Sequence, residues 1–188
     1  MRKLLFDRNS IVLQPLLDLI ILQKHRTLVL WTIDCSMRML PLFEEKYPLD
    51  VRPRNAVEAA KDWAFGKIKM PEAKAAALAA HDAATAVKDD YSAAAVARAM
   101  GHVVGTVHVE THAIGVIMYG LTAAVHRGGV EGSEELVKKE CQWFYNRLQY
   151  WEKNIDTIKG PWASFLLRDH EENKELLLRK KISKIRHD

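Results

Sequence analysis

Apolar side chains recur every three or four residues along most of the chain, a spacing that gathers them on one face of an α-helix. Two such stripes consist of Leu28, Trp31, Cys35, Met39 and Leu42, and of Val137, Cys141, Phe144, Leu148 and Trp151. The sequence contains no window of alternating β-branched and polar residues, the pattern typical of strands. It therefore predicts an all-α fold, a compact multi-helix bundle that forms one domain over residues 1–188.

Capping residues, prolines and glycines divide this pattern into segments. Asn55, Pro71, Asp90 and Ser133 indicate helix starts, and Gly129 indicates a stop. The expected helices cover residues 11–23, 25–46 with an interruption at Pro41, 55–65, 71–88, 91–126, a segment from 133 through the second stripe, and 171–185. Residues 91–126 are apolar nearly all round, so we expect them to form the central, buried helix, with any break at a glycine.

Small residues are concentrated in the middle of the chain. Alanine occupies 18 of the 45 positions from Ala56 to Met100, and small side chains let helix axes approach closely. A helical wheel of residues 91–126 collects on one face Ala94, Ala97, Gly101, Gly105, His108, His112, Gly115 and Tyr119. We therefore expect Ala/Gly-rich close helix packing, with two histidines on the seam.

The formal net charge of +4 belongs to the end of the chain. Residues 179–188 contain five Lys or Arg side chains and one aspartate, so the rest of the chain is neutral. Nucleic-acid binders usually spread basic residues over a face of the folded domain. Nucleic acid is therefore not an expected partner, beyond a weak, salt-sensitive contact by the basic C-terminal helix.

Two cysteines, Cys35 and Cys141, lie in apolar helical stretches and are expected to be buried, reduced thiols. The first residues lack the apolar core of a secretory signal. No apolar run reaches the roughly 20 residues that a membrane-spanning helix needs. These features predict a soluble, cytoplasmic protein without a membrane partner.

Histidines are the first candidates for chemistry. His108 and His112 are four residues apart, which on one helix suits two imidazoles converging on a metal. His81 and His102 are further candidates, provided that the fold brings them near. The favoured interpretation is that neutral histidines hydrogen-bond between tightly packed helices. No cofactor and no metal are expected, and a metal, if bound, would be held by His108 and His112.

Asp34 is the second candidate, because it lies at the edge of an apolar stripe and a buried carboxylate needs a partner. Arg52, Arg54 or a histidine is the expected partner, and an interhelical salt bridge is favoured over catalysis. The sequence contains no P-loop, dinucleotide fingerprint or nucleophile elbow. We therefore expect a protein that is not an enzyme, with Trp162 as an exposed anchor for a partner.

A family resemblance runs through roughly residues 26–125. Its motifs are Leu30-Trp31, Asp34-Cys35, Leu40 to Glu44, Arg52 to Arg54, Ala56 to Ala60, Trp63, Gly66, Ala80-His81, Gly101-His102, His108, His112-Ala113 and Tyr119. Together they resemble the type-five-like immunity proteins of bacterial polymorphic toxin systems. Residues 1–24 and 130–188 lie outside the resemblance as helical extensions.

The resemblance implies a non-enzymatic protein that binds and neutralises a cognate toxin in the producing cell. The polar and aromatic residues of the motifs are the candidate binding residues, namely Asp34, Arg52, Arg54, His81, His102, His108, His112 and Tyr119. The alternative is a metal-binding protein or hydrolase that uses the His108/His112 helix. An alanine-rich helical protein of this size is also compatible with a homodimer.

Overall fold

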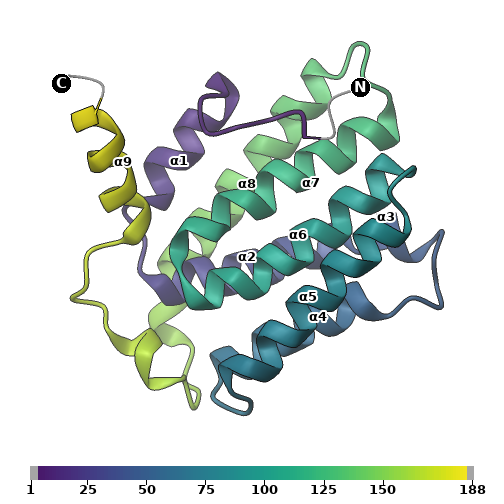
Figure 1. The fold of residues 1–188 in the computed structure, drawn as a ribbon. Coiled ribbons are helices and arrows are strands. Elements are labelled where there is room, and N and C mark those ends of the chain that lie inside the picture. Colours follow the sequence, from purple (N-terminus) through teal and green to yellow (C-terminus); the bar gives the residue numbers. More distant parts are fainter. Residues whose placement is uncertain (1–3, 186–188) are drawn as a thin grey trace.

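The computed structural model describes residues 4–185, and every α-helix in that range belongs to one bundle (Figure 1). The helices are α1 (Gln14–Ile20), α2 (His25–Met39), α3 (Pro41–Glu44), α4 (Arg52–Ala64), α5 (Met70–Ala86), α6 (Tyr91–His108), α7 (Ala113–Gly128), α8 (Glu134–Asn154) and α9 (Lys174–Ile185). Short 3-10 turns lie at Ile11–Leu13, Glu110–His112, Ile155–Thr157 and Ser164–Leu167. The predicted all-α fold is confirmed.

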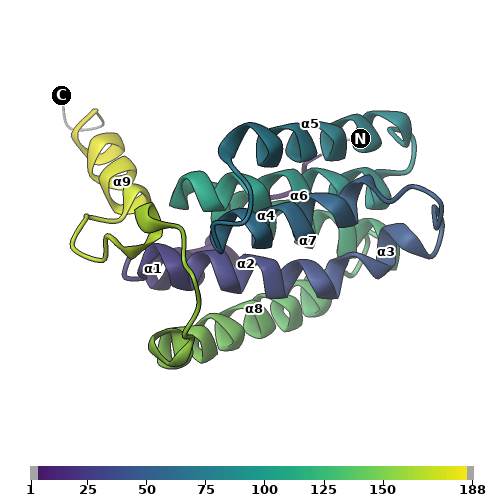
Figure 2. The same cartoon turned by 90° about the horizontal axis from the view of Figure 1, so that it is seen from below.

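Helix α6 is the centre of the bundle, since it contacts α2, α3, α4, α5 and α7. Seen from below, α5 lies on one outer side of the bundle and α8 on the opposite side, while α1 and α9 lie together at one end (Figure 2). Val96, Met100, Val103 and Val107 of α6 are fully buried. Such burial stabilises a protein by about 1.5–3 kcal/mol for each large aliphatic side chain. The expected central position is thus confirmed for residues 91–108.

The long helix expected over residues 91–126 is wrong, because the chain breaks at Val109 and not at a glycine. Val109 is fully extended, with φ −154° and ψ 136°, and the turn Glu110–His112 leads into α7. The guanidinium of Arg8 donates a hydrogen bond of 2.9 Å to the carbonyl of Thr111 and so holds this turn. The break folds α6 and α7 back against each other, so their small residues face a neighbouring helix.

One expected helix start is confirmed, and two others lie at different residues than expected. Asp90 caps α6 as predicted, accepting a hydrogen bond of 3.1 Å from the amide of Ala93. Helix α4 begins at Arg52 rather than at Asn55, because Pro53 is already pre-organised for the first turn. The last helix begins at Lys174, after Asn173 accepts a bond from the Glu175 amide.

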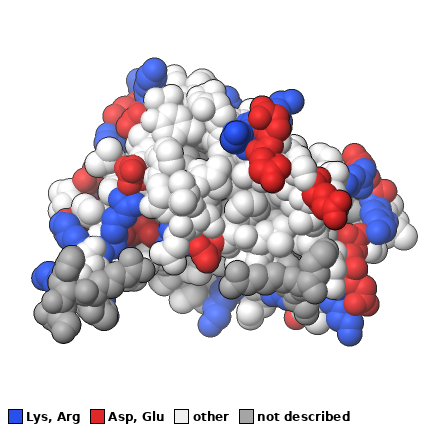
Figure 3. All heavy atoms as spheres, turned by 90° about the horizontal axis from the view of Figure 1, so that it is seen from above, with Lys and Arg blue, Asp and Glu red and all other residues white. Residues whose placement is uncertain are grey.

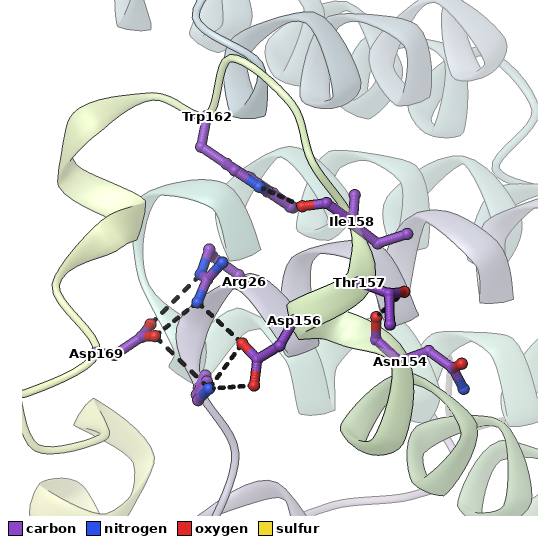
Figure 4. Close-up of polar contacts among 8 residues, drawn as sticks. Arg26, Asn154, Asp156, Thr157, Ile158, Trp162 and Asp169 are labelled. Atoms are coloured by element: carbon purple, nitrogen blue, oxygen red, sulfur yellow. Dashed lines mark hydrogen bonds and ion pairs between the residues drawn. The ribbon is translucent and has the colours of Figure 1, made fainter.

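The segment between α8 and α9 is tied to the start of α2 (Figure 4). Arg26 pairs with Asp169 at 2.6 Å and with Asp156 at 3.4 Å, and its guanidinium lies 5.7 Å from the Trp162 ring centroid. The Trp162 indole also packs on Phe65, with ring centroids 5.0 Å apart. The expectation of an exposed Trp162 is therefore wrong, because this side chain is half-buried and holds the segment in place.

Both thiols and the basic end of the chain can be placed. Cys35 and Cys141 are buried and unpaired, as predicted, and burial raises the pKa of Cys141 to about 11.

In α9, Lys180 pairs with Glu172, and Arg179 pairs with Asp18 of α1. Part of the positive charge is thus balanced by the body, while Arg186 and Asp188 lie outside the described residues.

Charged side chains of both signs lie mainly toward the edges of the face shown in Figure 3, around a broad uncharged area. In the described part of the chain, no helix is both long enough and apolar enough to cross a membrane.

Candidate functional site

Four histidines from different parts of the chain gather beside α6. His81 comes from α5, His102 and His108 from α6, and His112 from the turn before α7. The Nδ1 atoms of His102 and His112 are 3.1 Å apart, a hydrogen-bond distance. The ring of His81 stands edge-on to that of His102, with centroids 6.2 Å apart. The structure thus brings His81, from the expected helix 71–88, together with His102 and His112, which the sequence analysis placed on one helix over residues 91–126.

Glycines make room for these rings. A Cβ atom at Gly101 would lie 2.5 Å from the His81 ring, and one at Gly115 would lie 2.5 Å from His102. At Gly105 the same atom would lie 2.7 Å from His112. Real Cβ atoms do not approach other atoms this closely, so each imidazole occupies the space that a larger residue would fill. The small-residue seam therefore holds histidines as well as neighbouring helices.

Burial keeps His81, His102 and His112 neutral at neutral pH. The pKa of His102 is lowered to about 4, mainly because burial disfavours the imidazolium, with further repulsion from His112, His81, Arg8 and Arg98. Burial also lowers the pKa of His81 and of His112. In the contact between His102 and His112 one neutral ring donates and the other accepts, so the two rings are opposite tautomers.

His108 and His112 do not lie on one continuous helix as expected, because α6 ends at His108 and the chain breaks at Val109. His108 instead stacks on Trp63, with ring centroids 6.2 Å apart and an interplanar angle of 16°. Over residues 4–185 the structure has no group of three or more His, Cys, Asp or Glu side chains arranged to hold a metal ion.

An open pocket of about 400 Å³ lies between α4, α5 and α6 and receives three of the four histidines. We call it the histidine pocket, and its lining residues are Trp63, Met70, Lys74, Ala77, Leu78, His81, Gly101, Val104, Gly105, His108 and His112. Met70 and Leu78 on its rim are 46% and 54% exposed, respectively. Exposed apolar side chains around a concave surface are typical of a binding site.

Asp34 lies away from this pocket and pairs with a residue that the sequence analysis did not consider. Its Oδ2 accepts hydrogen bonds from the guanidinium of Arg147 and, at 2.8 Å, from Nε1 of Trp151, both on α8. The expected partners Arg52, Arg54 and histidine are therefore wrong. The cause is tertiary, since α8 packs along α2 and presents this arginine to the carboxylate.

The remaining candidates are Arg52, Arg54 and Tyr119. Arg52 pairs with Asp50, and Arg54 pairs with Glu44, each at 2.6 Å, so both guanidinium groups hold the connection from α3 to α4. Tyr119 lies against His102, with ring centroids 5.3 Å apart. Of the sequence-predicted residues, the four histidines and Tyr119 form one cluster, while Asp34 and the two arginines lie outside it.

Truncating Arg147 should test the contribution of the Asp34 pair. Arg147→Ala leaves the partly buried carboxylate with Trp151 as its remaining donor, and we expect it to lower the free energy of unfolding by about 1–2 kcal/mol. Arg127→Ala is the matched control, because Arg127 and Glu45 form an exposed interhelical pair, worth about 0.5 kcal/mol or less. Equal effects of the two substitutions in urea unfolding would refute a special role for the Asp34 pair.

A second buried acid–base contact was missed by sequence reasoning. Glu110 is 7% exposed, and its Oε1 lies 3.8 Å from Nδ1 of His25. The Nε2–H of His25 donates to the Thr106 carbonyl at 2.6 Å, because a carbonyl can only accept. Glu110 was visible between two histidines in the sequence, but its actual partner is 85 residues away, so local spacing held no signal for the pair.

Comparison with known families identifies the chain at the family level. Residues 18–150, more than half of the chain, match the family described as Imm-5 like putative immunity protein. The match includes all four clustered histidines and extends beyond the motifs of residues 26–125 on both sides. No curated protein and no solved structure gives a match. The chain therefore belongs to the Imm-5 like family of immunity proteins.

Proposed function

We propose that this protein binds a cognate bacterial toxin in the cytoplasm of the producing cell and neutralises it without catalysis. The observation that carries the proposal is family membership over residues 18–150. The site's chemistry supports it, because His102 and His112 contact each other at hydrogen-bond distance and His81, His102 and His112 pack on glycines within the bundle. Burial lowers the pKa of His81, His102 and His112 and keeps these three rings uncharged at neutral pH, which suits an interface core better than it suits acid catalysis.

The toxin is the proposed occupant of the surface around the histidine pocket. Its rim presents Met70 and Leu78, and its floor contains the stacked rings of Trp63 and His108. Protein interfaces draw most of their binding energy from a few apolar and aromatic groups in such a centre. His81 and His112 also line the pocket. His102 contacts both of these rings and in turn lies against Tyr119.

Asp34, Arg52 and Arg54 have a different proposed role. Each is already paired with an oppositely charged side chain of the same molecule. We therefore assign these three to holding α2, α4 and α8 in position, so their substitution should change stability before it changes toxin binding.

Co-expression with a toxin candidate, chosen from the products of the neighbouring genes, tests the proposal. The wild-type chain should restore growth, and Leu78→Glu should abolish protection because it places a charge on the apolar rim of the pocket that the toxin would cover. Leu49→Glu is the matched control, since Leu49 is 96% exposed and lies outside the pocket. It should protect like the wild type.

Two outcomes would contradict the proposal. Failure of the wild-type chain to protect against the neighbouring toxin would remove the function itself. Full protection by folded Leu78→Glu would be consistent with neutralisation but would show that the histidine pocket is not the contact surface.

A further inference from the structure

We propose that the histidine pocket binds a small aromatic carboxylate, a ligand that joins an apolar ring to an anionic group. This inference goes beyond toxin neutralisation and does not depend on it, because it concerns what the pocket recognises.

The wall favours an apolar ring. Trp63, Met70, Leu78 and Val104 are among the residues that line the pocket, and most of its lining surface is apolar. The Trp63 indole and the His108 imidazole lie nearly parallel, at an interplanar angle of 16°. Flat aromatic faces of this kind favour offset-stacked or edge-to-face contact with another ring.

The polar groups favour an anion. Lys74 is the charged residue among those that line the pocket, and no aspartate or glutamate lines it in the described part of the chain. His81 and His112 are neutral, and each neutral imidazole carries one N–H donor. A carboxylate accepts from both kinds of group, whereas a cationic ligand would meet Lys74 and find no counter-charge.

The size and stiffness of the pocket fit one small group. Its volume of about 400 Å³ lies at the lower end of the range of small-molecule sites, roughly 300–1,000 Å³. Its histidine side is held in place, because His81 and His112 pack directly on glycines of α6. A pocket that is already formed loses little conformational freedom on binding.

Two kinds of ligand combine an apolar ring with a carboxylate: a free arylalkanoate and the C-terminal phenylalanine of a polypeptide chain. Three probes separate them, and binding is followed by NMR through the ring resonances of His81, His108 and His112. The first probe is 3-phenylpropionate, the second is the uncharged 3-phenylpropanol, and the third is N-acetyl-Ala-Ala-Phe with a free carboxylate. Saturable shifts with 3-phenylpropionate and at least about threefold weaker binding of the alcohol are expected for a site that pairs the anion with an exposed lysine.

The peptide distinguishes the sources. Tighter binding of the peptide than of 3-phenylpropionate would assign the pocket to a chain end, and weaker binding would assign it to a free acid. Absence of saturable shifts with both carboxylates, or equal affinity for the alcohol, would overturn the proposal whatever the outcome with a toxin.

Two variants locate the interaction. Lys74→Gln should weaken binding of 3-phenylpropionate about threefold and leave the alcohol unaffected, because the lysine is exposed and its charge is screened. Leu78→Glu should weaken the carboxylate by about tenfold or more, since it adds a like charge to the rim. Lys88→Gln, in the turn that follows α5 and outside the pocket, is the control and should leave all three affinities unchanged. Unchanged affinity in Lys74→Gln and Leu78→Glu would place the ligand elsewhere.

Discussion

Replacing Gly115 by alanine should lower the free energy of unfolding by about 2 kcal/mol, although alanine usually stabilises a helix interior by about 1 kcal/mol over glycine. The reason is the His102 ring, whose Nδ1 would lie 2.5 Å from the new methyl carbon. His102 is held by its contact with His112 and by the Tyr119 ring, so it has little room to move. Urea unfolding followed by circular dichroism measures the change.

A double-mutant cycle makes this prediction specific. In a His102→Ala background the ring is gone, so Gly115→Ala should become neutral or stabilising. Gly128→Ala, at the end of the same helix, is the matched control because its Cβ would meet only the flexible end of Leu136, at 3.2 Å. A similar loss of stability with and without His102, or in Gly128→Ala, would show that the imidazole is not the cause.

Acidification should destabilise the fold through His102. Its pKa is about 4 in the folded protein and 6.5 for the ordinary side chain. Between these values the unfolded chain binds the proton and the folded chain does not, so the free energy of unfolding falls as the pH falls. The loss is fully developed below pH 4 and reaches roughly 3 kcal/mol for this one group.

Comparison of two variants isolates this effect from the protonation of carboxylates. His102→Gln should be less stable at neutral pH but should lose roughly 3 kcal/mol less than the wild type between pH 6.5 and 4. Tyr119→Phe alters a ring beside His102 and leaves the number of imidazoles unchanged, so its pH dependence should match that of the wild type. Parallel pH profiles for His102→Gln and the wild type would show that His102 does not carry the proton linkage.

Much of the fold follows from local physical chemistry that the sequence exposes. The apolar stripes of α2 and α8, the Asp90 cap and the terminating glycines depend on neighbours within a few residues. The break at Val109 does not, because nothing in the local pattern ends a helix there. It is stabilised by the turn Glu110–His112 and by Arg8, which contacts it from the distant N-terminal segment.

The sequence indicated which types of residue gather at the candidate site, but it did not predict how they are arranged. The wheel placed glycines and histidines on one face, and the structure does pack imidazoles on glycines. The pairing, however, is between Gly115 and His102 and between Gly105 and His112, which requires α6 and α7 to fold against each other. Asp34 shows the same limit, since Arg147 reaches it across 113 residues.

Calorimetric titration of the purified chain with a toxin candidate, chosen from the products of the neighbouring genes, measures directly whether the chain binds a toxin. The account predicts a saturable complex of fixed stoichiometry, loss of that complex with folded Leu78→Glu, and retention of it with Leu49→Glu. Absence of heat and of a complex with the folded wild-type chain would contradict the claim that this member of the Imm-5 like family neutralises a toxin by binding it.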